Sequence, residues 1–196
     1  MIDRFKQRAL SWSQLSLFNY SPEQWYDKYI LGQKEPESEA MKFGKKIGEQ
    51  LASDMKFLPK VLRYSIFEKE LGGKIGDIPL IGFLDSFCPD TKNFYEYKTS
   101  SNAKKWTKKS AQEFGQILMY MFLIWLNYKI PPEKISATLF YIPVEENGSF
   151  ELNLTKEPVQ SFIVKHTSSE VLNFGVEIKN IVKQMEAFCK TKSRPK

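Results

Sequence analysis

Asp85, Glu96 and Lys98 are the three residues whose types could together perform chemistry. Two adjacent carboxylates repel each other by roughly 1 to 4 kcal/mol at about 4 Å, and a divalent cation offsets that repulsion. Ligands that are all oxygen favour Mg²⁺, Mn²⁺ or Ca²⁺. The lysine can orient or deprotonate a water, or stabilise charge that develops on a phosphate. A metal that polarises a phosphate and activates water is what phosphodiester hydrolysis requires.

These residues come together only if two strands form a hairpin. Residues 78–88 and 93–99 read as strands on either side of a turn that contains Pro, Asp and Thr. Closure in the middle of that turn places Asp85 opposite Glu96. Lys98 shares the face of Glu96, because side chains two positions apart on a strand point the same way. The sequence therefore predicts one patch with two acids and one amine.

An ordinary surface cluster of cross-strand ion pairs is the alternative interpretation of this patch. Such a cluster contributes only a few tenths of a kcal/mol. Asp85 argues against it because it follows the apolar run Ile81–Leu84. A carboxylate within an apolar strand is costly unless it is paired or bound to a metal.

The first part of the chain reads as helices followed by a strand. Serines at 11 and 13 begin a helix, and Ser21–Pro22 begins a second one with Ser as N-cap and Pro at the first helical position. Apolar residues every four positions over 41–55 predict a third helix. Alternation over 62–69 predicts a strand, and we expect Gly72–Asp77 to be a turn-rich connection.

The second part of the chain predicts more helices and two further strands. One long helix is expected over 110–128, and strands are expected over 137–144 and 149–154. Residues 157–189 read as mostly helical, with a break around Phe174–Gly175. This order of elements predicts an α/β fold, an α/β/α sandwich with a central mixed sheet. We find no internal boundary, so a single domain over 1–196 is expected, with a frayed basic tail at 190–196.

Several of these motifs together resemble a known family. They are Ser11–Phe18 with Ser21–Pro22, Gly82-x-x-Asp85, Glu96-x-Lys98-Thr99, and Gln116-x-x-x-Tyr120. In this order they resemble the RecB-like, phage-type exonuclease branch of the PD-(D/E)XK nuclease superfamily. The resemblance runs from about Ser11 to Tyr120, more than half of the chain. It implies a restriction-endonuclease-like core with helical N- and C-terminal additions.

The resemblance also implies roles for five residues. Asp85 and Glu96 would bind metal, and Lys98 would be the catalytic lysine. Gln116 and Tyr120, one helical turn apart, would face the site and position either the DNA strand or the lysine. An ordinary helix face, with Tyr120 half in the core, is the alternative for this last pair.

One departure from the family pattern concerns a metal ligand. Such nucleases often have His four residues after a helical Gly, and Gly48 stands at that position after Gly44. Glu49 is the favoured replacement as metal ligand. Glu68, Glu70 or water could also serve, because Mg²⁺ often keeps several waters. The two glycines could instead allow close packing of the helix on the sheet.

A second departure concerns cysteine. Several relatives hold an iron–sulfur cluster through four cysteines, the first beside the early proline, where Ser21 precedes Pro22 here. Cys88 and Cys189 are the only cysteines, so we predict no iron–sulfur cluster. They form no disulfide framework either, and the first residues lack a secretory signal. We therefore expect a cytoplasmic protein, and the absence of a long apolar run predicts no membrane span.

A basic segment after the second strand suggests a contact with DNA. The formal net charge of +6 and the pI near 9.1 fit a polyanionic partner, although solubility alone can explain them. We expect four lysines to contact phosphates and the Trp among them to stack on a base, or that Trp to be tucked inward. The predicted DNA-binding residues are Ser100, Lys104, Lys105, Trp106, Lys108 and Lys109.

Together these observations predict a Mg²⁺- or Mn²⁺-dependent deoxyribonuclease. The short chain favours a stand-alone exonuclease that processes DNA in recombination, repair or a phage system. A restriction-like endonuclease and a DNA-binding module with a weak active site are the alternatives. Single- or double-stranded DNA is the expected partner, with a further copy of the chain or a recombination protein as possible associates. His166, the only histidine, is expected on a helix surface outside the site.

Overall fold

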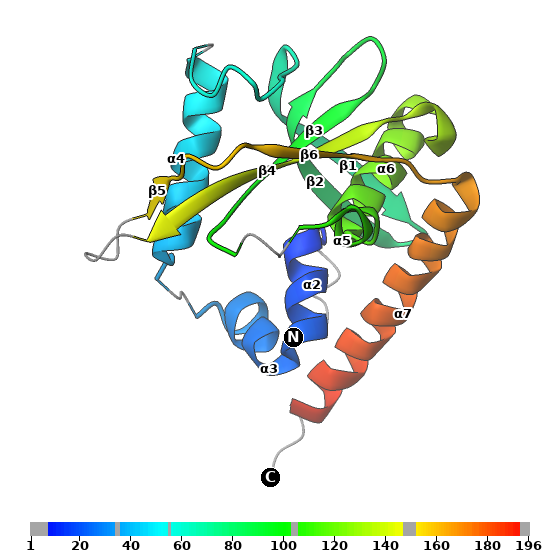
Figure 1. Ribbon diagram of the computed structural model, residues 1–196. Helices are drawn as coiled ribbons and strands as arrows, with labels where there is room; N and C mark the ends of the chain where they lie inside the picture. The colour runs from blue at the N-terminus through cyan, green and yellow to red at the C-terminus, as the bar shows by residue number, and fades with distance from the viewer. Residues whose placement is uncertain (1–7, 34–35, 55, 103–105, 147–151, 193–196) are drawn as a thin grey trace.

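A mixed β-sheet lies between helices on both of its faces (Figure 1). The protein is described by a computed structural model over residues 8–33, 36–54, 56–102, 106–146 and 152–192. Helix α4 (Glu39–Ser53) covers one face of the sheet. Helix α6 (Gly115–Tyr128) covers the other face, and α7 (Ser168–Lys192) packs against α6. This arrangement is the α/β/α sandwich that the sequence predicts.

The sheet has one parallel pair of strands in an otherwise antiparallel arrangement. Its strands are β1 (Ile66–Ile75), β2 (Ile78–Phe87), β3 (Phe94–Ser100), β4 (Ala137–Glu146), β5 (Leu152–Leu154) and β6 (Gln160–Val164). Strands β1 to β4 lie side by side in chain order, and β5 and β6 both pair with β4. The parallel pair is β3 with β4. Helices α5 (Lys108–Gln112) and α6 connect these two strands.

Strand β3 shows how alternation builds a core on each face. Phe94 is fully buried against Tyr120 of α6, with ring centroids 5.8 Å apart. Tyr95 and Tyr97 point to the opposite face and pack in the cluster that contains Phe140 and the buried stripe of α4. Each large side chain buried in this way stabilises the fold by roughly 1.5 to 3 kcal/mol.

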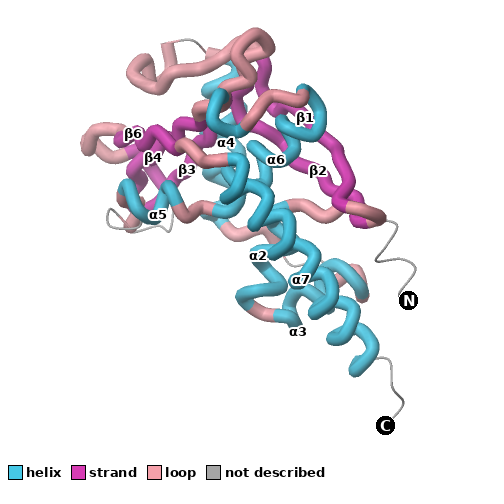
Figure 2. The backbone as a smooth tube through the Cα atoms, turned by 90° about the vertical axis from the view of Figure 1, so that its right-hand side faces the viewer, coloured by secondary structure: helices cyan, strands magenta, loops and turns pink. Residues whose placement is uncertain are grey.

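The N-terminal helices α2 (Trp12–Tyr20) and α3 (Pro22–Trp25) and the π-helical turn η1 (Tyr26–Ile30) form a layer beside α7 (Figure 2). The predicted N-cap is confirmed, because the Ser21 hydroxyl accepts a hydrogen bond from the backbone N–H of Gln24 at 3.3 Å. The Phe18 and Trp25 rings meet edge to face at 5.1 Å. This contact joins α2 to α3.

The single helix predicted over 110–128 is instead two helices. Helix α5 ends at Gln112, and Phe114 has an extended backbone before α6 begins. The break turns the Phe114 ring inward against Trp106, with ring centroids 5.0 Å apart at an angle of 79°. Tertiary packing of this ring therefore outweighs the helical preference of the sequence. Helix α6 ends at Tyr128, as predicted, with Lys129 in the left-handed conformation.

Three other predicted features of the helices and strands are wrong. Residues 72–75 belong to β1, and only Gly76 and Asp77 turn, because these residues pair with the start of β2 and lie under α6. Residues 160–164 form β6, because β4 offers them an edge for pairing. Helix α7 runs without a break through Phe174–Gly175, where both residues are buried against neighbouring elements.

Helix length and composition also bear on membranes. Helix α7 is the longest helix, and it has charged residues along its exposed face. Within the described ranges, no helix has both the length and the apolar character that crossing a membrane requires.

Candidate active site

The strands β2 and β3 separate where the two predicted acids lie. Their ladder pairs are Ser86 with Tyr95 and Phe87 with Phe94. Asp85 and Glu96 hold the next opposed positions, so the predicted hairpin register is confirmed. Beyond the last pair, Asp85 Oδ2 accepts a hydrogen bond from the backbone N–H of Tyr97 at 2.8 Å. The carboxylate thus fills the gap that opens between the two strands.

Glu96 and Lys98 form a buried ion pair. Lys98 Nζ lies 2.6 Å from Glu96 Oε1, and the Glu96 side chain is fully buried while that of Lys98 is 29% exposed. The amine also lies 5.5 Å from the centroid of the Phe114 ring. Glu96 Oε2 is buried and has no hydrogen-bond partner among the described residues. One oxygen of this buried carboxylate is therefore available for a further ligand.

The protonation of these groups follows from burial and from their mutual charges. Burial, followed by the nearby Glu96 charge, raises the pKa of Asp85 to about 7, although Lys98 opposes the rise. Burial likewise raises the pKa of Glu96, and Lys98 again opposes it. Burial lowers the pKa of Lys98, but the two carboxylates outweigh burial, so its pKa lies above the ordinary value. The lysine is therefore a stable ammonium.

Glu68 lies at the level of Asp85 on the neighbouring strand β1. The ladder between β1 and β2 has pairs at Phe67 and Lys69 but none at Glu68 itself. Its backbone φ is +48°, in the left-handed region that costs a non-glycine residue on the order of 1 kcal/mol or more. Burial, followed by the Asp85 charge, raises the pKa of Glu68. A strained acid therefore faces the predicted pair.

These residues line one cleft between α4 and the sheet. Its volume is about 740 Å³. Its lining residues come from five elements, α4, β1, β2, β3 and α6. They are Ala40, Met41, Gly44, Lys45, Ile47, Gly48, Glu49, Ala52, Phe67, Glu68, Asp85, Glu96, Tyr97, Lys98, Thr99 and Gln116. The predicted Asp85, Glu96, Lys98, Gln116 and Glu49 thus share one cavity.

Tyr120 lies behind this cleft. Gln116 Nε2 donates a hydrogen bond to the Tyr120 hydroxyl at 2.7 Å, and the Tyr120 side chain is 5% exposed. The Tyr120 ring packs on Gly82, where a Cβ atom would come within 2.7 Å of it. Tyr120 supports Gln116 from the core, where burial and then the Glu96 charge raise the pKa of its hydroxyl. The roles predicted for this pair stay predictions.

The two glycines of α4 do not serve close packing. A Cβ atom at Gly44 would make an ordinary contact of 3.5 Å with Thr99 Oγ1, and one at Gly48 would meet nothing within 4 Å. The interpretation that both allow close approach of helix and sheet is wrong, since both positions have room for a Cβ atom. Glu49 is exposed where it lines the cleft.

One residue of the cleft, Lys45, has no part in the predicted site, and a second, Thr99, enters it only as the last position of the Glu96-x-Lys98-Thr99 motif. Lys45 lies on α4, one helical turn before Glu49, and Thr99 follows Lys98 on β3. The spacing of Lys45 from Glu49 was a signal that the sequence contained. The position of Thr99 depends on the approach of α4, which no local pattern reports.

The predicted DNA-binding segment is only partly supported by its geometry. Lys104 and Lys105 lie outside the described residues, whereas Lys108 and Lys109 are exposed at the start of α5. Ser100 ends β3 beside the cleft residue Thr99.

Trp106 is the clearest correction within that segment. Its side chain is 8% exposed, and its ring packs edge to face on Phe114. The prediction of an exposed ring that stacks on a base is wrong, and the inward alternative holds. The physical reason is that the break before α6 creates an aromatic pocket that buries this ring more favourably than water would.

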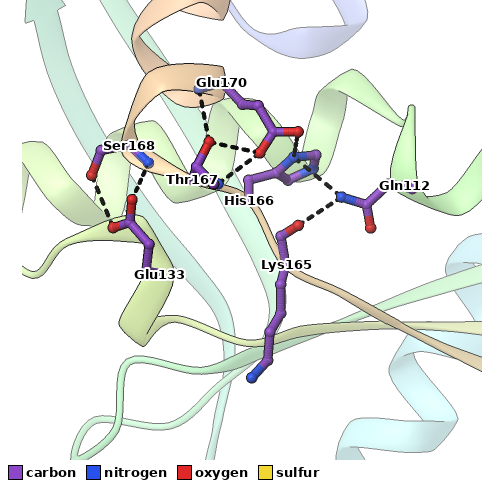
Figure 3. Close-up of polar contacts among 7 residues, drawn as sticks. All are labelled: Gln112, Glu133, Lys165, His166, Thr167, Ser168 and Glu170. Atoms are coloured by element: carbon purple, nitrogen blue, oxygen red, sulfur yellow. Dashed lines mark hydrogen bonds and ion pairs between the residues drawn. The ribbon is translucent and has the colours of Figure 1, made fainter.

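His166 has a structural role at the start of α7. The sequence predicted a helix surface for His166, but the residue is buried. Its Nδ1 lies 3.6 Å from Glu170 and 3.4 Å from Gln112 (Figure 3). Burial lowers the pKa of His166, and Glu170 opposes that shift. Thr167 and Glu170 exchange the hydrogen bonds of a capping box. The histidine lies outside the cleft.

Comparison with known proteins supports the fold through structure alone. No protein-family model matches this sequence, and no curated protein matches it either. A predicted exonuclease from Eubacterium rectale aligns over 99% of this chain and 91% of its own, with a TM-score of 0.61 and 13% identity. A phage-related exonuclease from Haemophilus somnus 129PT aligns over 98% and 94%, with a TM-score of 0.56 and 13% identity.

A third similar structure is the alkaline exonuclease from Laribacter hongkongensis. It aligns over 98% of this chain and 95% of its own, with a TM-score of 0.53 and 13% identity. The chain therefore has the fold of these phage-type and alkaline exonucleases, as the resemblance to the PD-(D/E)XK superfamily predicts. At this level of identity the likeness concerns the fold, and function must be argued from the site.

Proposed function

We propose that this protein is a metal-dependent nuclease that hydrolyses phosphodiester bonds in DNA. The observation that carries the proposal is the convergence of Asp85, Glu96 and Lys98 in one cleft, at the point where β2 and β3 separate. Two acids and a fixed ammonium form the set that metal-assisted phosphodiester hydrolysis uses. The fold shared with proteins described as exonucleases supports the same class of reaction.

The residues of the cleft fit a hard divalent cation such as Mg²⁺ or Mn²⁺. The buried Oε2 of Glu96 has no hydrogen-bond partner among the described residues, and Asp85 adds a second oxygen donor. Among those same residues no group of three His, Cys, Asp or Glu side chains is already placed around a metal position. Asp85 and Glu96 would therefore hold the ion mainly with water, and Glu68 or Glu49 is the candidate for a further acidic ligand. When bound, the ion supplies polarisation of the phosphate and activation of water.

Lys98 would act as an electrostatic group at the reacting phosphate. Its pKa is raised by two carboxylates, so it favours charge stabilisation over proton abstraction. The Glu96 carboxylate and the Phe114 ring hold the amine in place. Gln116, held by Tyr120, would position a phosphate oxygen or the attacking water within the same cleft.

We favour digestion from DNA ends over internal cleavage. The similar structures are described as exonucleases, and one was solved in complex with dAMP, a nucleotide of the kind that an exonuclease releases. Recombination, repair and phage DNA processing are the settings that use such an activity. A restriction-like endonuclease and a DNA-binding module remain the competing functions, and the same assay separates all three.

The decisive assay compares wild type with Lys98→Ala on end-labelled linear, closed circular and single-stranded DNA in Mg²⁺ or Mn²⁺. We expect digestion of linear DNA from its ends, and a loss of at least about a hundredfold in Lys98→Ala, because the group that stabilises transition-state charge is gone. Lys190→Ala, an exposed change on α7, is the matched control. Cleavage of closed circles would assign an endonuclease, and binding without cleavage would assign the module.

A further inference from the structure

A shallow groove lies on the solvent side of α2, outside the cleft. Its volume is about 370 Å³, near the lower end of small-ligand sites. The groove is lined by Trp12, Ser13, Ser16, Leu17, Tyr20, Lys28 and Tyr29. These residues come from one face of α2 and from the π-helical turn η1 that packs beside it.

The chemistry of this groove combines aromatic rings, hydroxyls and one amine. The Tyr20 side chain is 82% exposed, which is unusual for a large aromatic residue. Lys28 Nζ lies 5.7 Å from the centroid of the Tyr29 ring. Among the described residues that line the groove there is no carboxylate. Proteins bind single-stranded nucleic acids through aromatic rings that stack on the bases and through cations that contact the backbone phosphates.

The groove adjoins the wall of the proposed active site through Trp12. The Trp12 ring occupies the space that a Cβ atom on Gly115 would need. Gly115 directly precedes Gln116, which lines the cleft. The Trp12 ring also packs on Phe114, at 6.0 Å between centroids, and Phe114 in turn lies beside the Lys98 amine. Trp12 therefore belongs to the groove and supports the residues of the cleft.

From this juxtaposition we infer that the groove binds the single DNA strand that continues from the phosphodiester in the cleft, with bases stacked on Trp12 and Tyr20 and a phosphate at Lys28. The inference rests on the proposed nuclease function, because it takes DNA as the substrate. A groove of this volume has room for about one or two nucleotides, and its aromatic rings suit bases that are unpaired.

The test measures binding of 5′-fluorescein oligothymidylates, from about 3 to about 12 nucleotides long, by fluorescence anisotropy in EDTA. We expect Tyr20→Ala to weaken binding of the long oligonucleotides about fivefold or more, the loss of one stacked base. The shortest oligonucleotides fill only the cleft, so their affinity stays unchanged. Tyr20→Phe keeps the ring and binds like wild type. Leu172→Ala, a change at an apolar residue on α7 that is 52% exposed, is the control for surface truncation.

Crosslinking provides a second readout that needs no substitution. Oligothymidylates with 5-iododeoxyuridine at successive positions should crosslink to the peptide that contains Trp12 and Tyr20, at positions several nucleotides from the end held in the cleft. Equal binding of wild type and Tyr20→Ala at every length, or crosslinks confined to other peptides, would overturn the inference.

The outcomes also separate this inference from the proposed function. If wild type digests DNA but Tyr20→Ala behaves like wild type at every length, the inference about the groove is wrong and the proposed nuclease function holds. If wild type cleaves no DNA but the length-dependent effect of Tyr20→Ala remains, the groove binds DNA and the proposed nuclease function is wrong.

Discussion

Asp85 lies between Glu68 on β1 and Glu96 on β3, and this position decides its chemistry. Its carboxylate replaces a backbone partner for Tyr97 instead of pointing to water. Burial and then the Glu96 charge favour its protonated form, and the Lys98 ammonium relieves only part of this. A cation that binds here would remove the repulsion, so metal affinity and protonation are coupled.

The first prediction concerns the stability of Asp85→Asn. Folding raises the pKa of the Asp85 carboxyl from 3.8 to about 7. This shift does not lower the free energy of unfolding below about pH 4, lowers it progressively from about pH 4 to 7, and lowers it by a constant amount above that. Without metal, Asn at this position should therefore stabilise the protein by about 4 kcal/mol at pH 8 and by little at pH 4. Urea unfolding at both pH values measures the difference.

Metal addition supplies the control for this prediction. Mg²⁺ at pH 8 should stabilise wild type and leave Asp85→Asn unchanged, because a ligand that binds only the folded state stabilises it. If the free energy of unfolding depended on pH in the same way in both proteins, folding would not raise the pKa of Asp85.

The second prediction concerns the third acidic ligand. Burial and then the Asp85 charge raise the pKa of Glu68, so Glu68 lies near the predicted pair, whereas Glu49 lies on the opposite wall of the cleft. Glu68→Gln should weaken Mn²⁺ binding about tenfold or more in titration calorimetry, and Glu49→Gln should have little effect. Glu70→Gln, on the same strand, is the matched control. A loss confined to Glu49→Gln would instead assign the ligand to α4, as the sequence suggested.

At the scale of elements, the site depends on how helix α6 meets the sheet. Its first turn presents Gln116 to the cleft, and its second presents Tyr120 to the strand that bears Asp85. Gly82, three residues before Asp85, leaves the space that the Tyr120 ring and Leu123 occupy. The Gly-x-x-Asp motif therefore has a packing reason as well as a chemical one.

The third prediction compares two glycine substitutions. Gly82→Ala should destabilise the fold by about 1 to 3 kcal/mol, because its Cβ atom would come within 2.7 Å of the Tyr120 ring and 2.9 Å of Leu123. Gly48→Ala should stabilise the fold by about 0.5 to 1 kcal/mol, because α4 gains a better helix former in open space. Thermal unfolding of both variants checks the opposite signs. A loss of stability in Gly48→Ala would show that the open space is needed.

At the scale of the whole molecule, the positions of the basic residues matter more for DNA binding than the net charge of +6. Lys45 lies in the cleft, and Lys108 and Lys109 are exposed on α5. Helix α5 is joined to α6 only through Glu113 and Phe114, so these lysines begin the helical layer that follows β3. Cations at that place would guide a polyanion toward the cleft.

The fourth prediction concerns the salt dependence of DNA binding. Replacing Lys108 and Lys109 together by Glu should weaken binding and lower the slope of log affinity against log salt by about 1 to 2, since each lost phosphate contact removes about 0.7 to 0.9. Lys179 and Lys183 on α7, replaced in the same way, change the net charge equally and should leave most of the slope. Equal slopes for the two double variants would mean that α5 does not contact the DNA.

The sequence alone determined what depends on neighbours along the chain. The turn between β2 and β3 and the period of two in β3 placed Asp85 opposite Glu96 and Lys98 beside it. Ser21 and Pro22 marked a helix start that the structure contains. Turn chemistry, capping and side-chain alternation act over a few residues, so a pattern in the sequence reports them directly.

The tertiary structure decided which distant partner each residue meets. It buried Trp106 under Phe114, broke the helix before Gly115 and placed β6 on the edge of β4. It also brought Glu68 to the level of Asp85. These outcomes depend on contacts between elements far apart in the chain, where burial of apolar surface outweighs local preference. No window of sequence contains both partners of such a contact, and so the depth of the cleft and the groove beside it emerged only from the fold.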